Sequence, residues 1–403
     1  MKRLVCLLIL SIVFAACSPV RASQTFNLWP PATLEAPTSE QSAPPSETPA
    51  VAVTMEKAPE DVTDAATDNS TEAPTVLSRT PMPVVEPTEM ARPRSSFGRV
   101  ILAAYYPWYD EGVWNRGITS DRPVAPYNSD NSAMIARHIA QARSLGIDGF
   151  VSAWLERGDR TDRNLAKLLA ASRGTDFRST VAVQTSLYRS KSQESFANAL
   201  GYIVATYGNH PNYFKVDGKP VIFFTDMLRV PDGAVDPKAA WRQIRSKVDP
   251  NNDQIWIAEG LDPSYLTVFD GLYVIKITHR DYPDDYLKLP RWGNQVRQWA
   301  TTLAAPKIWV ATTMPGWDDT RAADMPDLRD PSPPSRRDRE DGLFYRKTFE
   351  KACESRPDWI YIASFNEWVE GTQIEPSVSY GERYFDLTRE FAGTFKSDSA
   401  LCW

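Results

Sequence analysis

Histidine is scarce in this chain of 403 residues. The three histidines are His138, His210 and His279, and they lie far apart along the sequence. A zinc site of the usual kind needs several His or Cys ligands at short spacing, and a Ser/His/Asp triad depends on a well-placed histidine. The sequence therefore offers no zinc-type cluster and little basis for a triad, and we expect neither a metal nor a cofactor.

The sequence also lacks an excess of positive charge and a phosphate-binding turn. The formal net charge is -6 and the isoelectric point is near 5.4, so the chain lacks the basic footprint of a nucleic-acid-binding protein. Neither GxGxxG nor GxxxxGK[ST] follows the first predicted strand, which removes the usual support for nucleotide binding. We expect no nucleic-acid partner.

The N-terminal apolar run is too short to cross a bilayer. It extends from Leu4 to Ala16 after two basic residues, whereas a spanning helix needs about 20 apolar residues. A basic start, an apolar segment and small residues before Cys17 are typical of a secretory signal and resemble a bacterial lipobox. We predict that residues 1–17 are a lipoprotein-type signal peptide with lipidation at Cys17. Secretion after cleavage near Ala22 is the alternative.

Residues 18–96 are rich in Pro, Ser, Thr, Ala and Glu and show no sustained period of two or 3.6. Such a composition cannot bury enough apolar surface to offset the entropy of ordering the chain. We predict a disordered linker with a typical reach of about 50 Å. The protein is then expected in the cell envelope, facing outside the cytoplasm and held to the membrane by its lipid alone, or secreted.

Two cysteines, Cys353 and Cys402, remain outside the signal region. They could form one disulfide in an oxidising compartment or stay free, and the sequence leaves both possibilities open.

Apolar runs alternate with amphipathic stretches through residues 97–403. The predicted strands are Val100–Tyr106, Gly149–Trp154, Thr180–Thr185, Pro220–Thr225, Gln254–Glu259, Gly271–Ile277, Lys307–Thr312 and Trp359–Ser364. The predicted helices are Ser132–Leu145, Asp162–Ser172, Gln193–Tyr207, Pro237–Lys247, Arg291–Leu303, Gly342–Ser355 and Gly381–Phe395. Such alternation indicates parallel strands covered on both faces. Eight units favour an α/β fold of the (β/α)8 TIM barrel type over a doubly wound sheet.

Aromatic and acidic side chains gather where these strands end, which is where a barrel places its active site. They are Tyr105, Tyr106, Trp108, Trp154, Asp226, Glu259, Trp317 and Asp319. Any one aromatic of this kind is more often a core residue. Their recurrence at one end of successive strands favours a cleft that binds carbohydrate.

The most informative segment follows the last strand. Glu367 and Glu370 flank Trp368 there, and Gly371 comes next. An acid and a base paired in this way can cleave a glycosidic bond; alternatively, both are first-turn acids of a helix. Residues three apart on a strand point to opposite faces. Both acids can therefore face one cleft only if the chain turns there, which Gly371 makes easy.

Taken together, the chain resembles glycoside hydrolase family 99, the endo-α-mannosidases and endo-mannanases. The matching segments are Tyr105–Tyr109, Tyr127–Asp130 with His138, Gly146–Gly149 with Ser152–Trp154, Tyr207–Pro211, Gly218–Pro220, Phe269–Tyr273, Pro315–Arg321 and Phe365–Pro376. The resemblance implies an endo-acting retaining hydrolase of glycans without an established need for a metal. It also adds substrate-binding candidates, namely Tyr188, Tyr273, Arg321, Asn366 and Trp368. We expect the protein to be a monomer.

The resemblance also implies separate roles for the two acids. Glu367 matches the base that acts on the 2-hydroxyl of the sugar, and Glu370 matches the general acid/base on the leaving oxygen. The sugar's own 2-hydroxyl is then the nucleophile, and a 1,2-anhydro sugar is the intermediate. An acid in this position must keep its proton near the working pH.

The chain departs from the family pattern at several substrate-contacting positions. Val369 stands where members usually have His, Ser186 lies where an Ile-Glu-Pro-Tyr type segment is usual, and residues 112–126 replace a His/Trp-rich loop. The hydrolase class is therefore better supported than a mannose substrate. A glycan-binding lipoprotein without activity is an alternative, although it would not need both acids. An assembly factor for surface polysaccharide would need neither acids nor rings.

Overall fold

The computed structural model describes residues 97–185, 192–225, 234–322, 334–397 and 402. Eight parallel strands follow the order β3-β2-β1-β11-β8-β7-β6-β5, and β3 also pairs with β5. Their bounds are β1 Val100–Tyr105, β2 Gly149–Trp154, β3 Thr180–Val183, β5 Lys219–Phe224, β6 Ile255–Glu259, β7 Gly271–Tyr273, β8 Ile308–Thr313 and β11 Trp359–Ile362. The ring is closed, and the predicted (β/α)8 barrel is confirmed.

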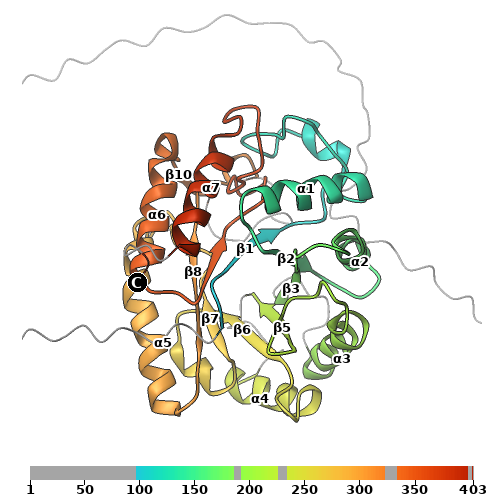
Figure 1. Cartoon of the computed structure of the whole chain (residues 1–403), viewed down its shortest axis with the longest axis vertical. Coiled ribbons are helices and arrows are strands. Elements are labelled where there is room, and N and C mark those ends of the chain that lie inside the picture. The colour runs from blue at the N-terminus through green and yellow to red at the C-terminus, as the bar shows by residue number, and fades with distance from the viewer. Residues whose placement is uncertain (1–96, 186–191, 226–233, 323–333, 398–401, 403) are drawn as a thin grey trace, which may run out of the picture. The chain divides into compact units, whose positions relative to one another are not determined.

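Helices surround the strands in Figure 1. They are α1 Ser132–Ser144, α2 Arg160–Ala171, α3 Gln193–Ile203, α4 Pro237–Val248, α5 Leu289–Leu303, α6 Leu343–Glu354 and α7 Arg383–Lys396. Helix α3 continues into one wider, π-helical turn over Val204–Gly208. Two short antiparallel pairs complete the sheets: β4 Lys215–Val216 pairs with β5, and β9 Trp317–Asp318 pairs with β10 Arg336–Arg337.

Polar side chains fix the starts of several helices. The Asn131 carboxamide oxygen accepts hydrogen bonds from the backbone N–H groups of Ala133 and Met134 before α1. The Asp159 carboxylate accepts from the N–H of Asp162 before α2. Such caps satisfy N–H groups that have no partner within the helix. The start of each of these helices is therefore set by a capping residue next to it in the sequence. This explains why the sequence predicts these helices well.

One predicted strand is too long. The sequence predicts Gly271–Ile277, but β7 ends at Tyr273 and pairs with β8 only through Gly271 and Leu272. The next carbonyl, that of Val274, accepts from the Thr312 side-chain hydroxyl instead of from a backbone N–H of β8. A side chain thus replaces the strand ladder at this point, and the apolar run continues as a loop at the catalytic end of the barrel.

Alternation along the strands decides which side chains fill the barrel. Glu259 lies opposite Tyr273 across the β6–β7 ladder, so both point to the same side. Tyr273 and Tyr361 lie inside the barrel with Phe223, with ring centroids 5.1 to 6.0 Å apart. This aromatic layer closes the barrel below the ends of the strands. Inward-facing groups placed above it are the ones that can form a site.

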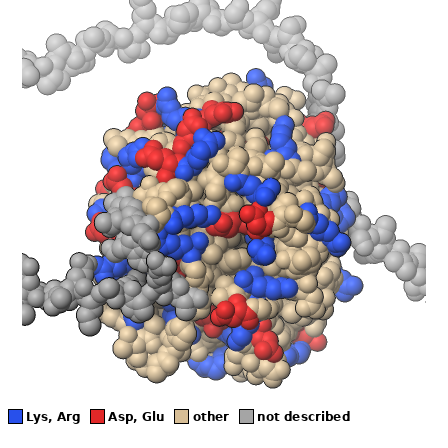
Figure 2. All heavy atoms as spheres, viewed as in Figure 1, with Lys and Arg blue, Asp and Glu red and all other residues tan. Residues whose placement is uncertain are grey.

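The described part of the chain contains one disulfide, between Cys353 on α6 and Cys402. The question that the sequence leaves open is thereby answered in favour of a bond. Among the described residues, no helix is long and apolar enough to cross a membrane. Charges of both signs are interspersed over the visible part of the face in Figure 2, so that face carries no broad field of one sign.

Candidate active site

The loop after β11 turns tightly where its two acids lie. The Gly371 N–H donates to the Trp368 carbonyl at 3.3 Å, and Gly371 has a φ of 62°. That conformation favours glycine, and a Cβ here would lie 2.9 Å from the carbonyl oxygen of Asp318. The chain therefore leaves the strand and turns at the position that the sequence predicts.

Glu367 is buried, with 4% of its surface exposed. Its Oε1 accepts from the Tyr109 hydroxyl at 2.8 Å and from the Val369 N–H at 3.1 Å. Its Oε2 is buried and has no hydrogen-bond partner among the described residues. Burial first, and then the charge of Glu370, raise the pKa of Glu367 to about 8, against 4.5 for an ordinary glutamate.

Glu370 is less buried than Glu367. Its backbone carbonyl accepts from the Asp318 N–H at 2.8 Å, which holds the turn against the loop after β8. Because its charge raises the pKa of Glu367, the two carboxyl groups form one electrostatic unit. When two carboxyl groups interact in this way, each observed titration step is a property of both groups together and not of one of them.

One other predicted residue, Tyr106, lies within electrostatic range of this pair. Burial raises the pKa of the Tyr106 phenol, and the charges of Glu370, Glu367 and Glu259 add to this. Burial likewise raises the pKa of Tyr273, with a further contribution from Glu259. The structure thus places Tyr106 near the glutamate pair, and Glu259 and Tyr273 near Tyr106.

Two predicted aromatics point away from this end. Tyr105 stacks on Phe150, with centroids 4.5 Å apart, and its hydroxyl meets His138 of α1. The Trp154 indole N–H donates to Asp162 of α2 at 2.9 Å. Both rings are buried between the barrel wall and the helices, so the expectation that they line the cleft is corrected. Alternation explains this, because a strand sends every second side chain outward.

Asn366 and Trp368 are also placed differently from the expectation. The Asn366 side chain clamps the backbone of Tyr106, accepting from its N–H at 2.7 Å and donating to its carbonyl at 3.1 Å. The Trp368 ring is fully buried against Trp114, with centroids 5.9 Å apart. Neither side chain is free to contact a sugar. Both instead fix the loop of Glu367 against the end of β1.

The remaining predicted residues lie around the same end of the barrel. Trp108 is partly buried beside Tyr106, with ring centroids 4.9 Å apart. Trp317 is buried, with the Lys276 ammonium 5.2 Å from its ring centroid. Asp319 accepts from the Ser335 N–H at 2.6 Å, and Arg321 is exposed. Tyr188, Asp226, Ser186 and Cys17 lie outside the described residues.

A second buried glutamate, Glu375, was not predicted. Its Oε1 lies 2.9 Å from the His138 Nε2. Its Oε2 accepts from the Tyr127 hydroxyl at 3.0 Å and from the Trp368 indole N–H at 3.3 Å. Both carboxylate oxygens are therefore satisfied. The spacing of Glu375 within the loop gives no signal for this role, because its partners come from distant segments.

Two further residues that are absent from the predicted site, Tyr109 and Arg339, also shape it. The Tyr109 hydroxyl donates to Glu367 and accepts from the Trp368 N–H at 3.0 Å. Arg339 donates to the carbonyls of Gly371 and Gln373, each at 2.9 Å. Tyr109 lies within a recognised segment and could have been found there. Arg339 lies in no motif, so the sequence carries no local signal for it.

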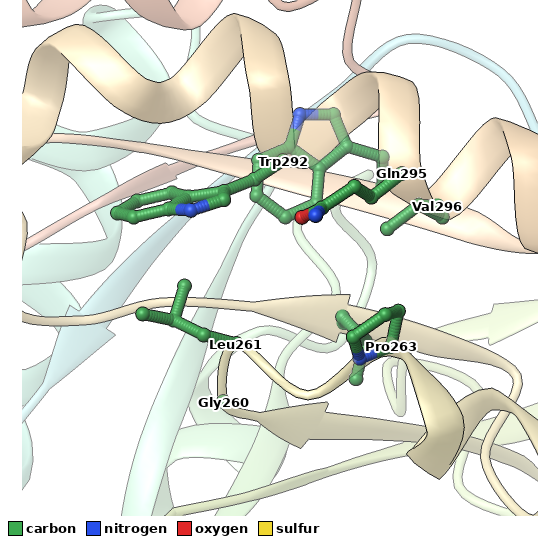
Figure 3. Close-up of a pocket in the computed structure, with 8 residues that line it drawn as sticks. Gly260, Leu261, Pro263, Trp292, Gln295 and Val296 are labelled. Atoms are coloured by element: carbon green, nitrogen blue, oxygen red, sulfur yellow. The ribbon is translucent and has the colours of Figure 1, made fainter.

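The described residues contain no group of three or more His, Cys, Asp and Glu side chains that could hold a metal ion. Figure 3 shows an apolar hollow on the outer side of the barrel wall, where Trp292, Gln295 and Val296 of α5 face Leu261 and Pro263. Neither glutamate of the pair lines it. The acid pair and the hollow are thus separate features.

A family model described as Glycosyl hydrolase family 99 matches residues 119–391, which include both glutamates. Glycoprotein endo-alpha-1,2-mannosidase of Mus musculus is 22% identical over 278 residues, which are 63% of this chain and 56% of that protein. The glycoprotein endo-alpha-1,2-mannosidase-like protein of Danio rerio is 23% identical over 313 residues, or 68% and 66% of the two chains. This chain thus spans little more than half of the mouse protein.

Solved structures show the same fold. The GH99 endo-alpha-mannosidase from Bacteroides thetaiotaomicron, in complex with bis-tris propane, has a TM-score of 0.63 at 24% identity, covering 74% of this chain and 97% of that one. A structure described as a glycoside hydrolase-like protein has a TM-score of 0.55 at 17% identity, covering 77% and 96%. At such identities the likeness concerns the barrel itself.

Proposed function

Because this chain belongs to glycosyl hydrolase family 99, as its sequence predicts, we propose that it is an endo-acting, retaining glycoside hydrolase. Its substrate is a glycan that contains α-mannosides or closely related sugars. The relative from Mus musculus and the structure from Bacteroides thetaiotaomicron are both named endo-α-mannosidases. The observation that carries the proposal is the buried Glu367, whose Oε2 has no partner although its Oε1 has two.

An unpartnered carboxylate oxygen in a buried position is costly unless something else satisfies it. The 2-hydroxyl of a bound sugar would donate to Oε2 and stabilise the ionised form of Glu367. The proton that Glu367 holds at neutral pH would then move to Glu370, because the coupled pair keeps one proton between its members. Substrate binding would thus place the base and the acid in their working states.

In the first step, Glu367 takes the proton of the sugar's 2-hydroxyl, and the oxygen of that hydroxyl attacks the anomeric carbon. The bond to the leaving oxygen breaks, and Glu370 gives that oxygen its proton. In the second step, water attacks the anomeric carbon and the bond from this carbon to the 2-oxygen breaks. Glu370 takes a proton from the water, and Glu367 returns its proton to the released 2-oxygen. Two inversions give net retention, and the pair ends as it began.

The test is hydrolysis of α-mannans by the protein, with product size measured by mass spectrometry and the anomeric form of the first product by NMR. We expect oligosaccharides rather than single sugars, released with the configuration of the substrate. Monosaccharide products would contradict endo cleavage, and an inverted product would contradict the two-step route. Binding without any products would favour a glycan-binding protein.

We further propose that the protein is a monomer held at the cell envelope by a lipid on Cys17 and facing outside the cytoplasm. The leader pattern of residues 1–17 and the Cys353–Cys402 disulfide support an exported protein. We expect Cys17→Ser to abolish labelling by a fatty-acid probe and to release the protein from the membrane fraction. Equal labelling of both forms would contradict the anchor.

A further inference from the structure

A polar pocket lies directly beside the turn that carries Glu370. It is a small hollow, open to solvent, between the loops that follow β1, β8 and β11. Its wall includes Trp317, Asp318, Arg336, Arg337, Arg339 and Gln373. We call it the arginine pocket. Gly371 also lines it, so its occupant would lie next to the group on which Glu370 acts.

Arg339 is the central observation in this pocket. Only 6% of its surface is exposed, and its guanidinium lies over the rings of Tyr380 and Tyr384, 4.5 and 4.4 Å from their centroids. Its Nη2 donates to the loop carbonyls, and the Tyr384 hydroxyl also interacts with the guanidinium, but its buried Nη1 forms no well-aligned hydrogen bond. Among the described residues no carboxylate lies within ion-pair distance of Arg339, although Asp121 acts on it from further away.

Other donors in the arginine pocket also lack acceptors. The Arg337 Nε and the Trp317 indole N–H are buried without partners among the described residues. Arg337 does pair through its other nitrogens, with Asp284 at 3.5 Å and Glu340 at 3.6 Å. Three N–H groups on residues that line the hollow thus lack partners, and so does one acceptor there, the Gln373 Oε1. Buried donors without acceptors are unfavourable, so a ligand that accepts from them would be stabilised.

The charges of the lining point to the kind of acceptor. Three arginines line the pocket against two aspartates, Asp318 and Asp338, and both aspartates lie near Arg336, at 3.9 and 3.4 Å. The positive charge of the exposed Arg336 is therefore offset by two aspartates, whereas the positive charge of the buried Arg339 is not. A buried cation without a counterion is strongly unfavourable. A ligand with negative oxygens would provide a countercharge for Arg339 and acceptors for the unpartnered N–H groups.

We propose that the arginine pocket binds an oxyanion, namely a carboxylate, sulfate or phosphate group carried by the glycan substrate. The inference rests on the proposed function and adds a substrate class to it, an acidic glycan. The anionic sugar would occupy the position next to the one whose bond is cleaved. Arg339 would then have two tasks, since it also holds the turn of Glu370 through the Gly371 carbonyl.

The test is equilibrium binding by calorimetry, with the full chain in a Glu367→Gln background so that hydrolysis does not interfere. The probes are an α-linked mannotriose, the same trisaccharide with one sulfate group on either end unit, and inorganic sulfate at matched ionic strength. We expect the better sulfated isomer to bind at least about tenfold more tightly than the neutral one, because hydrogen bonds between an arginine and a negative oxygen are stronger than those to a neutral hydroxyl. Arg339→Met should remove this preference.

Further variants separate binding from folding. Arg336 is exposed, so Arg336→Gln should fold normally and reduce the preference about two- to threefold. The control is Arg389→Gln, which removes another exposed arginine, on α7, paired with Asp386 and absent from the pocket. It should change nothing. Loss of the preference in this control would show a general charge effect and overturn the proposal.

The outcomes distinguish this inference from the proposed function. Equal binding of the neutral and sulfated trisaccharides would overturn the acidic substrate while leaving hydrolysis of neutral glycans intact. Binding of free sulfate with no advantage for the sulfated sugar would likewise overturn it, because the anion would then be an independent ligand. A preference that persists in folded Arg339→Met would place the anion elsewhere. Failure of every trisaccharide to bind would count against both proposals.

Discussion

The two ends of the loop after β11 each bury a glutamate, and the two are treated in opposite ways. At the far end, Glu375 meets His138, Tyr127 and Trp368, and both of its oxygens are satisfied. At the near end, Glu367 has partners on Oε1 alone. Both are about equally buried, at 5% and 4% exposure. Burial therefore does not separate them, whereas hydrogen bonding does.

The difference indicates which acid serves the scaffold and which serves the chemistry. A buried carboxyl with a complete set of donors ties distant segments together and has no capacity left for a ligand. A buried carboxyl beside a second charge, with one oxygen free, keeps a raised pKa and a vacant acceptor. Perturbed groups of this second kind concentrate at functional sites. The same loop thus supplies both a support and a candidate base.

The largest expected effect concerns turnover. Glu367→Gln and Glu370→Gln should each lower kcat/KM on a cleaved glycan by about 10³-fold or more, because each removes one proton-transfer group. Initial rates by reducing-end assay measure this. Binding of the same glycan should stay measurable, since the shape of each side chain is kept.

The matched control for turnover is Glu350→Gln, because Glu350 is exposed on α6. It should retain the parent rate within a factor of two or so, as is usual for surface changes. Parent-like turnover in either pair variant would remove the mechanism. A large loss in the control would show that the assay reports on something other than the acid pair.

The second effect is on stability and has a definite sign. The folded-state pKa of Glu367 is raised from 4.5 to about 8, so the folded protein binds this proton more tightly than the unfolded chain. Stability from this group is therefore lost as pH rises from about 4.5 to 8. Glu367→Gln does not titrate. At pH 9 it should be more stable than the parent by a few kcal/mol, at about 1.4 kcal/mol per pKa unit.

Urea unfolding at pH 5, 7 and 9 measures this difference. The advantage of Glu367→Gln should be largest at pH 9 and should shrink toward zero near pH 4.5. A constant difference at all three values would mean that the change acts through packing and that the pKa shift is not its cause.

The other end of the loop should respond in the opposite direction. Glu375→Ala leaves the Tyr127 hydroxyl, the Trp368 indole and His138 without their common acceptor. Buried groups that lose a partner cost about 1–3 kcal/mol each, so we expect a loss of about 3 kcal/mol in unfolding free energy. Glu350→Ala, the same change at an exposed helix position, should have little effect. If Glu375→Ala and Glu350→Ala lower the unfolding free energy equally, the hydrogen bonds of Glu375 do not stabilise the loop.

The comparison also shows what the sequence can and cannot predict. The eight strands and the turn at Gly371 follow from local patterns, since apolar runs, helix caps and a glycine mark them directly. The sequence misplaces Tyr105 and Trp154, because a position at the end of a strand does not by itself tell whether the side chain faces the cleft or the surrounding helices. Glu375 and Arg339 were missed for a different reason. Their partners lie in distant segments that only the closed barrel brings together.

The smallest effect tests the link between Glu367 and its donor. The Tyr109 hydrogen bond stabilises the ionised carboxylate and so lowers the pKa of Glu367. Tyr109→Phe should therefore raise that pKa further. Activity falls at high pH when the pair loses its last proton, so the alkaline limb of the kcat/KM profile should move upward. We expect about one pH unit, because a hydrogen bond to a charged group is worth about 1.5 kcal/mol or more.

The matched control is Tyr127→Phe, which removes a hydroxyl from Glu375 at the other end of the loop. It should lower stability and leave the alkaline limb where it is, because Tyr127 does not contact Glu367. An equal shift of the alkaline limb in both variants would mean that a looser loop causes the shift, and that the lost hydrogen-bond donor does not. A shift confined to Tyr109→Phe would tie the working proton to Glu367, since that carboxylate accepts directly from the Tyr109 hydroxyl.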